Sequence, residues 1–234
     1  MPNNYDTPAD LIGFEHQLVH LAKAIGRGNA KIVAIGSSST QGVGASSPEW
    51  SYPSRLAIEL TTHYPGVSIT VENKGVGGQE AGDELARFKK DVFALDPDLV
   101  VWQVGTNAVA KDYDFSEVEF AIDRGLRRLK QRHADIILMD PQYAGQVTDN
   151  PDHERMIRFI SSTAKKANVN VFRRFDLMKH WIDNRVPIEQ LINPDRLHQN
   201  DWSYLSVTRA LATAIVEAVA RPSAASRPAA SRPP

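Results

Sequence analysis

Five short apolar segments recur along the chain, and a stretch with apolar residues at helical spacing follows each of them. The apolar segments are Lys31–Gly36, Val67–Val71, Leu99–Val104, Asp135–Met139 and Val169–Phe172. The first, third and fourth are almost continuously apolar, which is typical of strands buried on both faces of a parallel sheet. The helical stretches are Pro53–Tyr64, Glu80–Ala94, Ser116–Arg132, Asp152–Ala167 and Trp202–Ala220. This alternation predicts one α/β domain of three layers.

The two ends of the chain differ from this pattern. Apolar residues three or four positions apart, from Leu11 to Ile25, predict an amphipathic N-terminal helical segment within residues 1–29 that packs on the domain at 30–220. Residues 221–234 repeat AASRP and contain no large apolar side chain, so we expect a mobile tail. Within the domain, Ser116 and Glu119 have the spacing of a capping box.

Composition excludes several classes of protein. The 234 residues include 27 Lys or Arg and 28 Asp or Glu, a balance that argues against nucleic acid as a partner. The absence of cysteine excludes disulfides, cysteine-ligated metals and a cysteine nucleophile. No segment approaches the roughly 18 apolar residues of a membrane span, and no cationic leader precedes an unbroken apolar run. We expect a soluble, cytoplasmic protein as the chain stands; export from a longer precursor and the oligomeric state stay open.

Small and polar residues follow the predicted strands. They form Gly36-Ser37-Ser38-Ser39-Thr40 after the first strand, Asn73-Lys74-Gly75-Val76-Gly77-Gly78 after the second, and Gly105-Thr106-Asn107 after the third, and Asn193–His198 precedes the last helix. Ligands of open parallel sheets bind at the carboxyl ends of the strands. The glycine segments do not fit the dinucleotide or P-loop patterns, and the serine segment does not fit G-x-S-x-G. No nucleotide cofactor is therefore predicted.

Together these four segments resemble the sequence blocks of the SGNH (GDSL-type) hydrolases, from about Ile32 to Ala220. The resemblance implies a flavodoxin-like α/β/α sandwich with a five-stranded parallel sheet in the order 2-1-3-4-5. It also implies ester hydrolysis without a cofactor, with Ser38 as nucleophile and Asp195 and His198 as its partners. The oxyanion donors fall on Ser38, Gly78 and Asn107. Two positions depart from the family, because Ser37 and Ala108 stand where Asp is usual.

The chemistry of these residues agrees with that resemblance. A serine hydroxyl needs a base, His198 can supply it, and Asp195 can hold the second ring nitrogen. The N–H groups of Ser38 and Gly78 and the amide of Asn107 can stabilise an oxyanion, and a glycine lets the backbone approach closely. The alternatives are a helix cap at Ser38, turn roles for Gly78 and Asn107, and ordinary loop roles for Asp195 and His198.

Other residues are candidates for substrate contacts or for a metal site. Asp140 and Tyr143 follow the fourth strand, and Trp50 lies near the serine segment, so we interpret all three as candidate substrate contacts. His16 and His20 are four apart on the predicted helix, but no third ligand is evident and no metal is predicted. Lys165-Lys166 and Arg173-Arg174 are interpreted as solvated surface charge.

We therefore interpret the chain as a serine esterase that cleaves a carboxylic ester through an acyl-enzyme on Ser38. A short acyl ester, such as an acetyl group on a carbohydrate, is the first candidate substrate. An acyltransferase, a thioesterase or a lysophospholipase with the same triad stays open. So does a catalytically silent carbohydrate-binding domain on the same fold.

Overall fold

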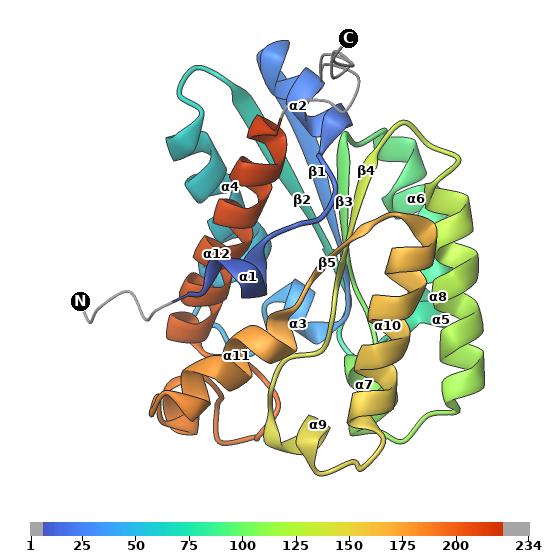
Figure 1. The fold of residues 1–234 in the computed structure, drawn as a ribbon, viewed down its shortest axis with the longest axis vertical. Coiled ribbons are helices and arrows are strands. Elements are labelled where there is room, and N and C mark those ends of the chain that lie inside the picture. Colours follow the sequence, from blue (N-terminus) through green and yellow to red (C-terminus); the bar gives the residue numbers. More distant parts are fainter. Residues whose placement is uncertain (1–6, 222–234) are drawn as a thin grey trace, which may run out of the picture.

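A parallel β-sheet forms the centre of the protein in a computed structural model that describes residues 7–221 (Figure 1). Its strands are β1 (Asn29–Gly36), β2 (Ser68–Gly75), β3 (Leu99–Gln103), β4 (Asp135–Met139) and β5 (Asn170–Phe172). They pair in the order β2-β1-β3-β4-β5, and every pair is parallel. The predicted α/β class and the strand order 2-1-3-4-5 are confirmed.

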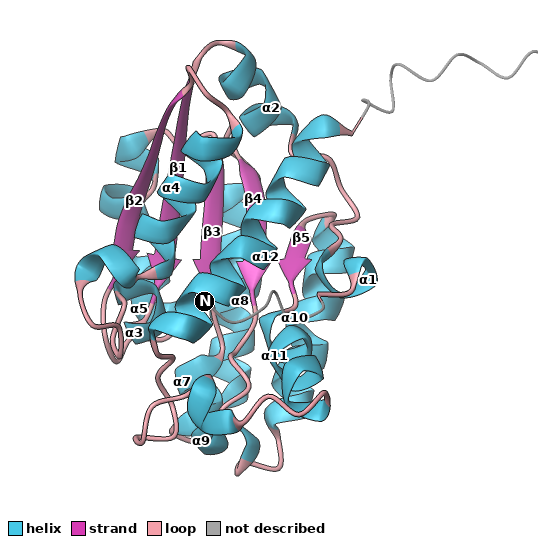
Figure 2. Cartoon of the chain, turned by 90° about the vertical axis from the view of Figure 1, so that its left-hand side faces the viewer, coloured by secondary structure: helices cyan, strands magenta, loops and turns pink. Residues whose placement is uncertain are grey.

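Helices cover both faces of the sheet (Figures 1 and 2). One face carries α1 (Ala9–Ile12), α2 (Val19–Gly26), α4 (Tyr52–His63), α11 (Arg174–Asp183) and α12 (Asp201–Ala220). The other carries α5 (Ala81–Ala86), α6 (Phe88–Asp91), α8 (Phe115–Leu129) and α10 (His153–Ala167). Three short helices lie at the carboxyl ends of the strands: α3 (Ser38–Gln41), α7 (Thr106–Ala110) and α9 (Gly145–Thr148). Single 3₁₀ turns occupy Pro48–Trp50, Phe93–Leu95 and Ile188–Gln190.

The core lies between the sheet and these helices. All five residues of β3 are buried, because helices cover both of its faces. The helix α8 shows how the outer layer is held, since its buried residues Val118, Ile122, Leu126 and Leu129 are three or four positions apart. Such a stripe covers one side of a helix and packs against the sheet.

Several predicted boundaries differ from the structure. The N-terminal segment is two helices, α1 and α2, because the chain leaves helical geometry at Gly13 and the side chain of Asn170 binds both the N–H and the C=O of His16. The capping box at Ser116 is wrong: Asp114 caps α8 and accepts a hydrogen bond from the Ser116 N–H, while Glu119 pairs with Arg155. The stretch Glu80–Ala94 is divided into α5, α6 and a 3₁₀ turn.

The chain outside the described range includes most of the predicted tail. Residues 222–234 lie beyond it, so the expectation of a mobile C-terminal segment stays a prediction. Among residues 7–221, no helix combines the length and the apolar character that crossing a bilayer requires.

Candidate active site

Ser38 is the first residue of α3, at the carboxyl end of β1. The preceding residue, Ser37, is bound to the end of β3, since its N–H and its hydroxyl both donate to Oε1 of Gln103 at 3.0 Å. The end of β2 approaches α3 closely at Gly75, where a Cβ atom would lie 2.0 Å from the backbone nitrogen of Gln41. Only a glycine fits there. The turn that carries Ser38 is therefore held by both neighbouring strands.

Ser38, His198 and Asp195 form a continuous hydrogen-bonded line. Nε2 of His198 lies 2.9 Å from Oγ of Ser38, 160 positions away in sequence. Nδ1 of His198 lies 2.6 Å from Oδ2 of Asp195. A carboxylate can only accept, so Nδ1 carries the proton and Nε2 accepts the hydroxyl hydrogen of Ser38. The structure thus brings together the three residues predicted as the triad.

Asp195 is held as an ionised acceptor. Its second oxygen, Oδ1, accepts hydrogen bonds from the backbone N–H of Leu197 at 3.0 Å and of His198 at 2.9 Å. Partial burial acts to raise the pKa of Asp195, but these bonds and the bond from the His198 ring outweigh burial and lower the pKa. The charge of Asp195 can therefore orient the imidazole and stabilise it when it gains a proton.

The loop that carries Asp195 and His198 is bound to the segment at Gly44 and to α9. Asn193 donates to the carbonyl oxygens of Gly44 at 3.0 Å and of Gln199 at 3.1 Å. Gln146, on α9, donates to the carbonyl oxygen of Asp195 at 2.7 Å. These bonds hold His198 against the turn that carries Ser38.

The predicted oxyanion donors lie beside this turn. Ser38 opens α3, where a helix leaves its first N–H groups without an intrahelical acceptor. The loop at residues 75–78, called here the glycine loop, packs against Ser38, since a Cβ on Gly77 would lie 3.9 Å from the Cβ of Ser38. Gly78 has a φ of +82°, and a Cβ there would meet only Nζ of Lys111 at 3.8 Å. Gly78 is therefore required by its left-handed backbone and not by close approach, which corrects the expectation from sequence.

Asn107 lies in the first turn of α7 and is buried. Its Nδ2 donates one hydrogen bond to the carbonyl oxygen of Gln79 at 2.7 Å. A side-chain amide has two N–H hydrogens, so a second one is left for a ligand. Asn107 and the glycine loop are thereby joined directly. The roles of Gly78 and Asn107 in binding an oxyanion stay predictions.

A chain of buried amides and hydroxyls connects these loops, and sequence analysis did not identify it. Gln103 donates to Thr106 at 3.2 Å, Thr106 to Gln142 at 3.1 Å, and Gln142 to the carbonyl oxygen of Leu197 at 3.1 Å. Since Gln103 also accepts from Ser37, the loops after β1, β3 and β4 are linked to the histidine loop. The available signal was Gln103 itself, a polar residue inside an apolar strand.

The interpretation of Arg174 as surface charge is wrong. Its side chain is fully buried, and the guanidinium donates to Ser39 at 3.3 Å, to Gln199 at 3.3 Å and to Gln142 at 2.8 Å. Burial lowers the pKa of Arg174 to about 10. The reason for the error is that Arg174 is the first residue of α11, a helix that sequence analysis did not predict and whose N-terminus points inward.

The interpretation of Asp140 as a substrate contact is also wrong. The residue is completely buried, and its Oδ1 accepts from the backbone N–H of Phe175 at 2.9 Å at the start of α11. Burial raises the pKa of Asp140 to about 7. Tyr143 is half-buried against Phe175, with ring centroids 5.1 Å apart, and Trp50 lies 4.9 Å beneath the guanidinium of Arg55. Substrate contacts by Tyr143 and Trp50 stay predictions.

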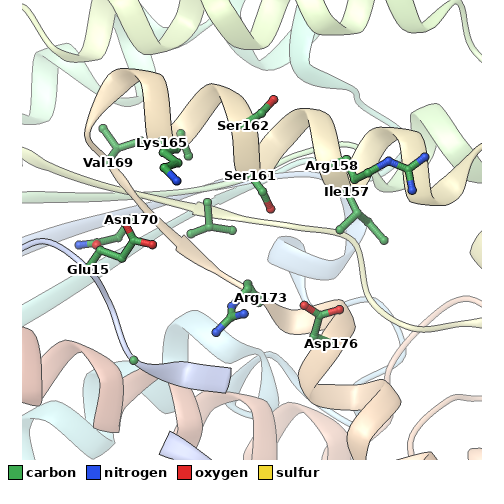
Figure 3. Close-up of a pocket in the computed structure, with 13 residues that line it drawn as sticks. Glu15, Ile157, Arg158, Ser161, Ser162, Lys165, Val169, Asn170, Arg173 and Asp176 are labelled. Carbon is green, nitrogen blue, oxygen red and sulfur yellow. The ribbon is translucent and has the colours of Figure 1, made fainter. Parts of the chain in front are cut away.

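A separate hollow lies beside the edge strand β5, between α10 and the segment after α1 (Figure 3). Its charged lining is mixed and includes Glu15, Arg158, Lys165, Arg173 and Asp176. No triad residue lines it.

The structure places His16 and His20 in different surroundings. The ring of His20 lies 6.1 Å from that of His133, and the backbone of His16 is bound to Asn170. In the described part of the chain, no group of three or more His, Asp or Glu side chains is arranged around a common point.

Comparison with known proteins identifies related esterases. A model of the non-GDSL lipase-like family matches residues 5–221. An acetylxylan esterase of Geobacillus stearothermophilus is 31% identical over 110 residues, which are 43% of this chain and 50% of that protein. An arylesterase of Vibrio mimicus is 25% identical over 130 residues, which are 54% of this chain and 64% of that protein. The matches thus span less than two thirds of each of these curated relatives. A solved two-domain esterase active on acetylated mannans shares the fold, with a TM-score of 0.76 and 18% identity over 93% of this chain and 58% of that chain.

Proposed function

Because the chain belongs to the non-GDSL lipase-like family, we propose that it is a serine ester hydrolase that forms an acyl-enzyme on Ser38. The observation that carries the proposal is the line of two hydrogen bonds from Ser38 through His198 to Asp195. A serine within reach of an oriented base is the arrangement that activates a hydroxyl as nucleophile. The similarity to esterases supports the same reaction.

The reaction follows from the positions of the protons. Nε2 of His198 removes the proton of Ser38 while Oγ attacks the ester carbonyl carbon, and Asp195 stabilises the imidazolium that forms. The N–H groups of Ser38 and Gly78 and the second N–H of Asn107 stabilise the oxyanion. The imidazolium then protonates the leaving alcohol, and the acyl group stays on Ser38. Water, deprotonated by His198, releases the acid and restores the serine.

We propose a short acyl ester of a carbohydrate, such as an O-acetyl sugar, as substrate. The support is the acetylxylan esterase that matches 43% of the chain. The triad also reaches solvent at one side, because the side chain of Asp195 is 46% exposed and that of His198 is 17% exposed. A bulky alcohol such as an oligosaccharide can approach a site that is open in this way.

The test is to combine covalent labelling with hydrolysis assays. A fluorophosphonate should label one residue, Ser38, and Ser38→Ala should lose both labelling and hydrolysis of 4-nitrophenyl acetate. The matched control Ser162→Ala changes an exposed serine on α10 and should behave as the parent. Acetylated xylooligosaccharides and nitrophenyl esters of increasing acyl length then rank the substrates. If the folded parent protein is neither labelled nor active, a silent binding domain is the better account.

A further inference from the structure

A buried carboxylate lies behind the turn that carries Asn107. We propose that this residue, Glu80, is a positioning residue that holds Asn107 in the geometry needed to bind the oxyanion. The inference rests on the proposed function, because it assigns Asn107 a role in the transition state. Glu80 is neither a residue of the predicted triad nor a predicted oxyanion donor, and it is buried.

The carboxylate of Glu80 binds the backbone on both sides of Asn107. Oε1 accepts from the N–H of Gly105 at 3.0 Å, and Oε2 accepts from the N–H of Ala108 at 2.5 Å. Oε1 also accepts from Ala81 at 2.9 Å, at the start of α5. Hydrogen bonds to a charged acceptor are short and strong. One side chain therefore joins the first turn of α5 to the first turn of α7.

The link is reciprocal. Asn107 donates to the carbonyl oxygen of Gln79, the residue that precedes Glu80. The start of α5 thus binds the start of α7 through the Glu80 side chain, and the start of α7 binds back through the Asn107 side chain. One N–H of the Asn107 amide is therefore bound to Gln79. The direction of its second N–H is then set by the position of the α7 backbone, which Glu80 holds.

The choice of glutamate at this position points to more than a helix cap. Glu80 is the N-cap of α5, where Ser, Thr, Asp or Asn is usual. A shorter side chain could cap α5, but it could not extend to Gly105 and Ala108. Glu80 is only 7% exposed, and burial raises its pKa against the effect of its three N–H donors. A carboxylate is costly to bury, and these donors offset that cost.

Three variants separate capping from positioning. Glu80→Gln keeps the length but turns an N–H₂ group toward one of the N–H donors, and Glu80→Ser keeps a cap for α5 without reaching α7. Because a misplacement of about 1 Å costs up to about a hundredfold in rate, both should lower kcat by roughly ten- to a hundredfold with KM nearly unchanged. The matched control is Asp83→Ala, which removes the other half of the same capping box, the carboxylate that accepts from the Glu80 N–H. It should lower the Tm and leave kcat unchanged.

A double-mutant cycle decides whether Glu80 acts through Asn107. In the Asn107→Ala background the turn carries no donor, so Glu80→Gln should change kcat by less than about twofold, because residues that act as one unit are not additive. Equal losses of kcat in both backgrounds would mean a general structural role and overturn the proposal. A kcat of Glu80→Gln equal to that of the parent would also overturn the proposal. An inactive, unlabelled parent would instead contradict the proposed function itself. Circular dichroism tests whether each variant is folded. If Glu80→Gln does not fold, the double-mutant cycle is carried out with Glu80→Ser.

Discussion

At the scale of single residues, the tautomer of His198 depends on one oxygen atom of Asp195. Oδ2 receives the ring N–H while Oδ1 is occupied by two backbone N–H groups. These bonds hold the carboxylate in one orientation, with Oδ2 as the acceptor for Nδ1. Nε2 of His198 is thereby kept free of hydrogen and able to accept from Ser38.

Replacing Asp195 by Asn tests this dependence. The amide can offer N–H₂ to Nδ1 and so favours the wrong tautomer, in which Nε2 carries the hydrogen. We expect Asp195→Asn to lower kcat by about 10⁴, the size of effect that the wrong tautomer has in a serine triad. The control is Asp149→Asn, which changes an exposed acid paired with Arg196 in the same region. A kcat/KM for 4-nitrophenyl acetate close to that of the parent would exclude Asp195 from the triad.

The amide of Asn107 can be tested in the same assay. Asn107→Ala should lower kcat by roughly 10²–10³ and leave KM nearly unchanged, because an oxyanion donor acts mainly in the transition state. Asn150 supplies a matched control: its amide also binds the α7 segment, through the carbonyl oxygen of Val109, but it is not an oxyanion candidate. If Asn107→Ala keeps more than about half of the parent activity, this donor is not part of the mechanism.

At the scale of elements, the site depends on how closely β2 approaches α3. Gly75 lies against the backbone of Gln41, so the ends of β1 and β2 and the first turn of α3 form one packed unit. Ser38, the proposed nucleophile, is thus placed by the packing of a strand end against a helix of only four residues. Movement of that strand end should move Ser38 with it.

Gly75→Ala is expected to disturb both stability and activity. The new Cβ would clash with backbone atoms, and overpacking of this kind costs roughly 1–3 kcal/mol. The free energy of unfolding in urea and kcat should both fall. Gly82→Ala is the control, because a Cβ on this α5 residue meets nothing within 4 Å and Ala favours helix over Gly. If Gly75→Ala has the same free energy of unfolding as the parent, the close packing of β2 against α3 is not required for stability.

At the scale of the whole molecule, a buried polar layer lies beneath the site. Arg174 and Asp140 are both fully buried, and Nε of Arg174 donates to the carbonyl oxygen of Asp140 at 3.1 Å. Burial raises the pKa of Asp140 to about 7 from an ordinary value of 3.8. The folded protein therefore holds a proton on Asp140 at pH values where the unfolded chain has lost it.

This difference makes stability depend on pH. As pH rises from about 4 to about 7, Asp140 acts to decrease the free energy of unfolding, because the folded state binds the extra proton. Asp140→Asn lacks this effect, so the parent should lose roughly 2–4 kcal/mol relative to the variant over that range, at about 1.4 kcal/mol per pKa unit. Urea unfolding between pH 4 and 8 measures it. The opposite contribution of Asp195, lost as pH falls, is common to both proteins and cancels. Parallel pH profiles would contradict the assignment.

Much of the architecture could be predicted from the chain itself. The apolar runs predicted the strands, and the polar segments at their ends predicted where the site lies, because parallel strands bring their carboxyl ends to one edge of the sheet. The resemblance to SGNH hydrolases, which these segments carried, and the strand order that the resemblance implied are both confirmed. The structure then brought Ser38, Asp195 and His198 within hydrogen-bonding distance.

Only the folded structure decided the surroundings of that site. A charged residue next to another charged residue, such as Arg174 beside Arg173, predicts solvent exposure, yet Arg174 is buried because the first turn of α11 faces the polar layer. Asp140 and Glu80 likewise hold backbone groups that are distant in sequence. The physical reason is the same in each case. Periodicity and short motifs report local conformation, whereas the burial of a polar side chain depends on which donors and acceptors the remainder of the fold brings to it.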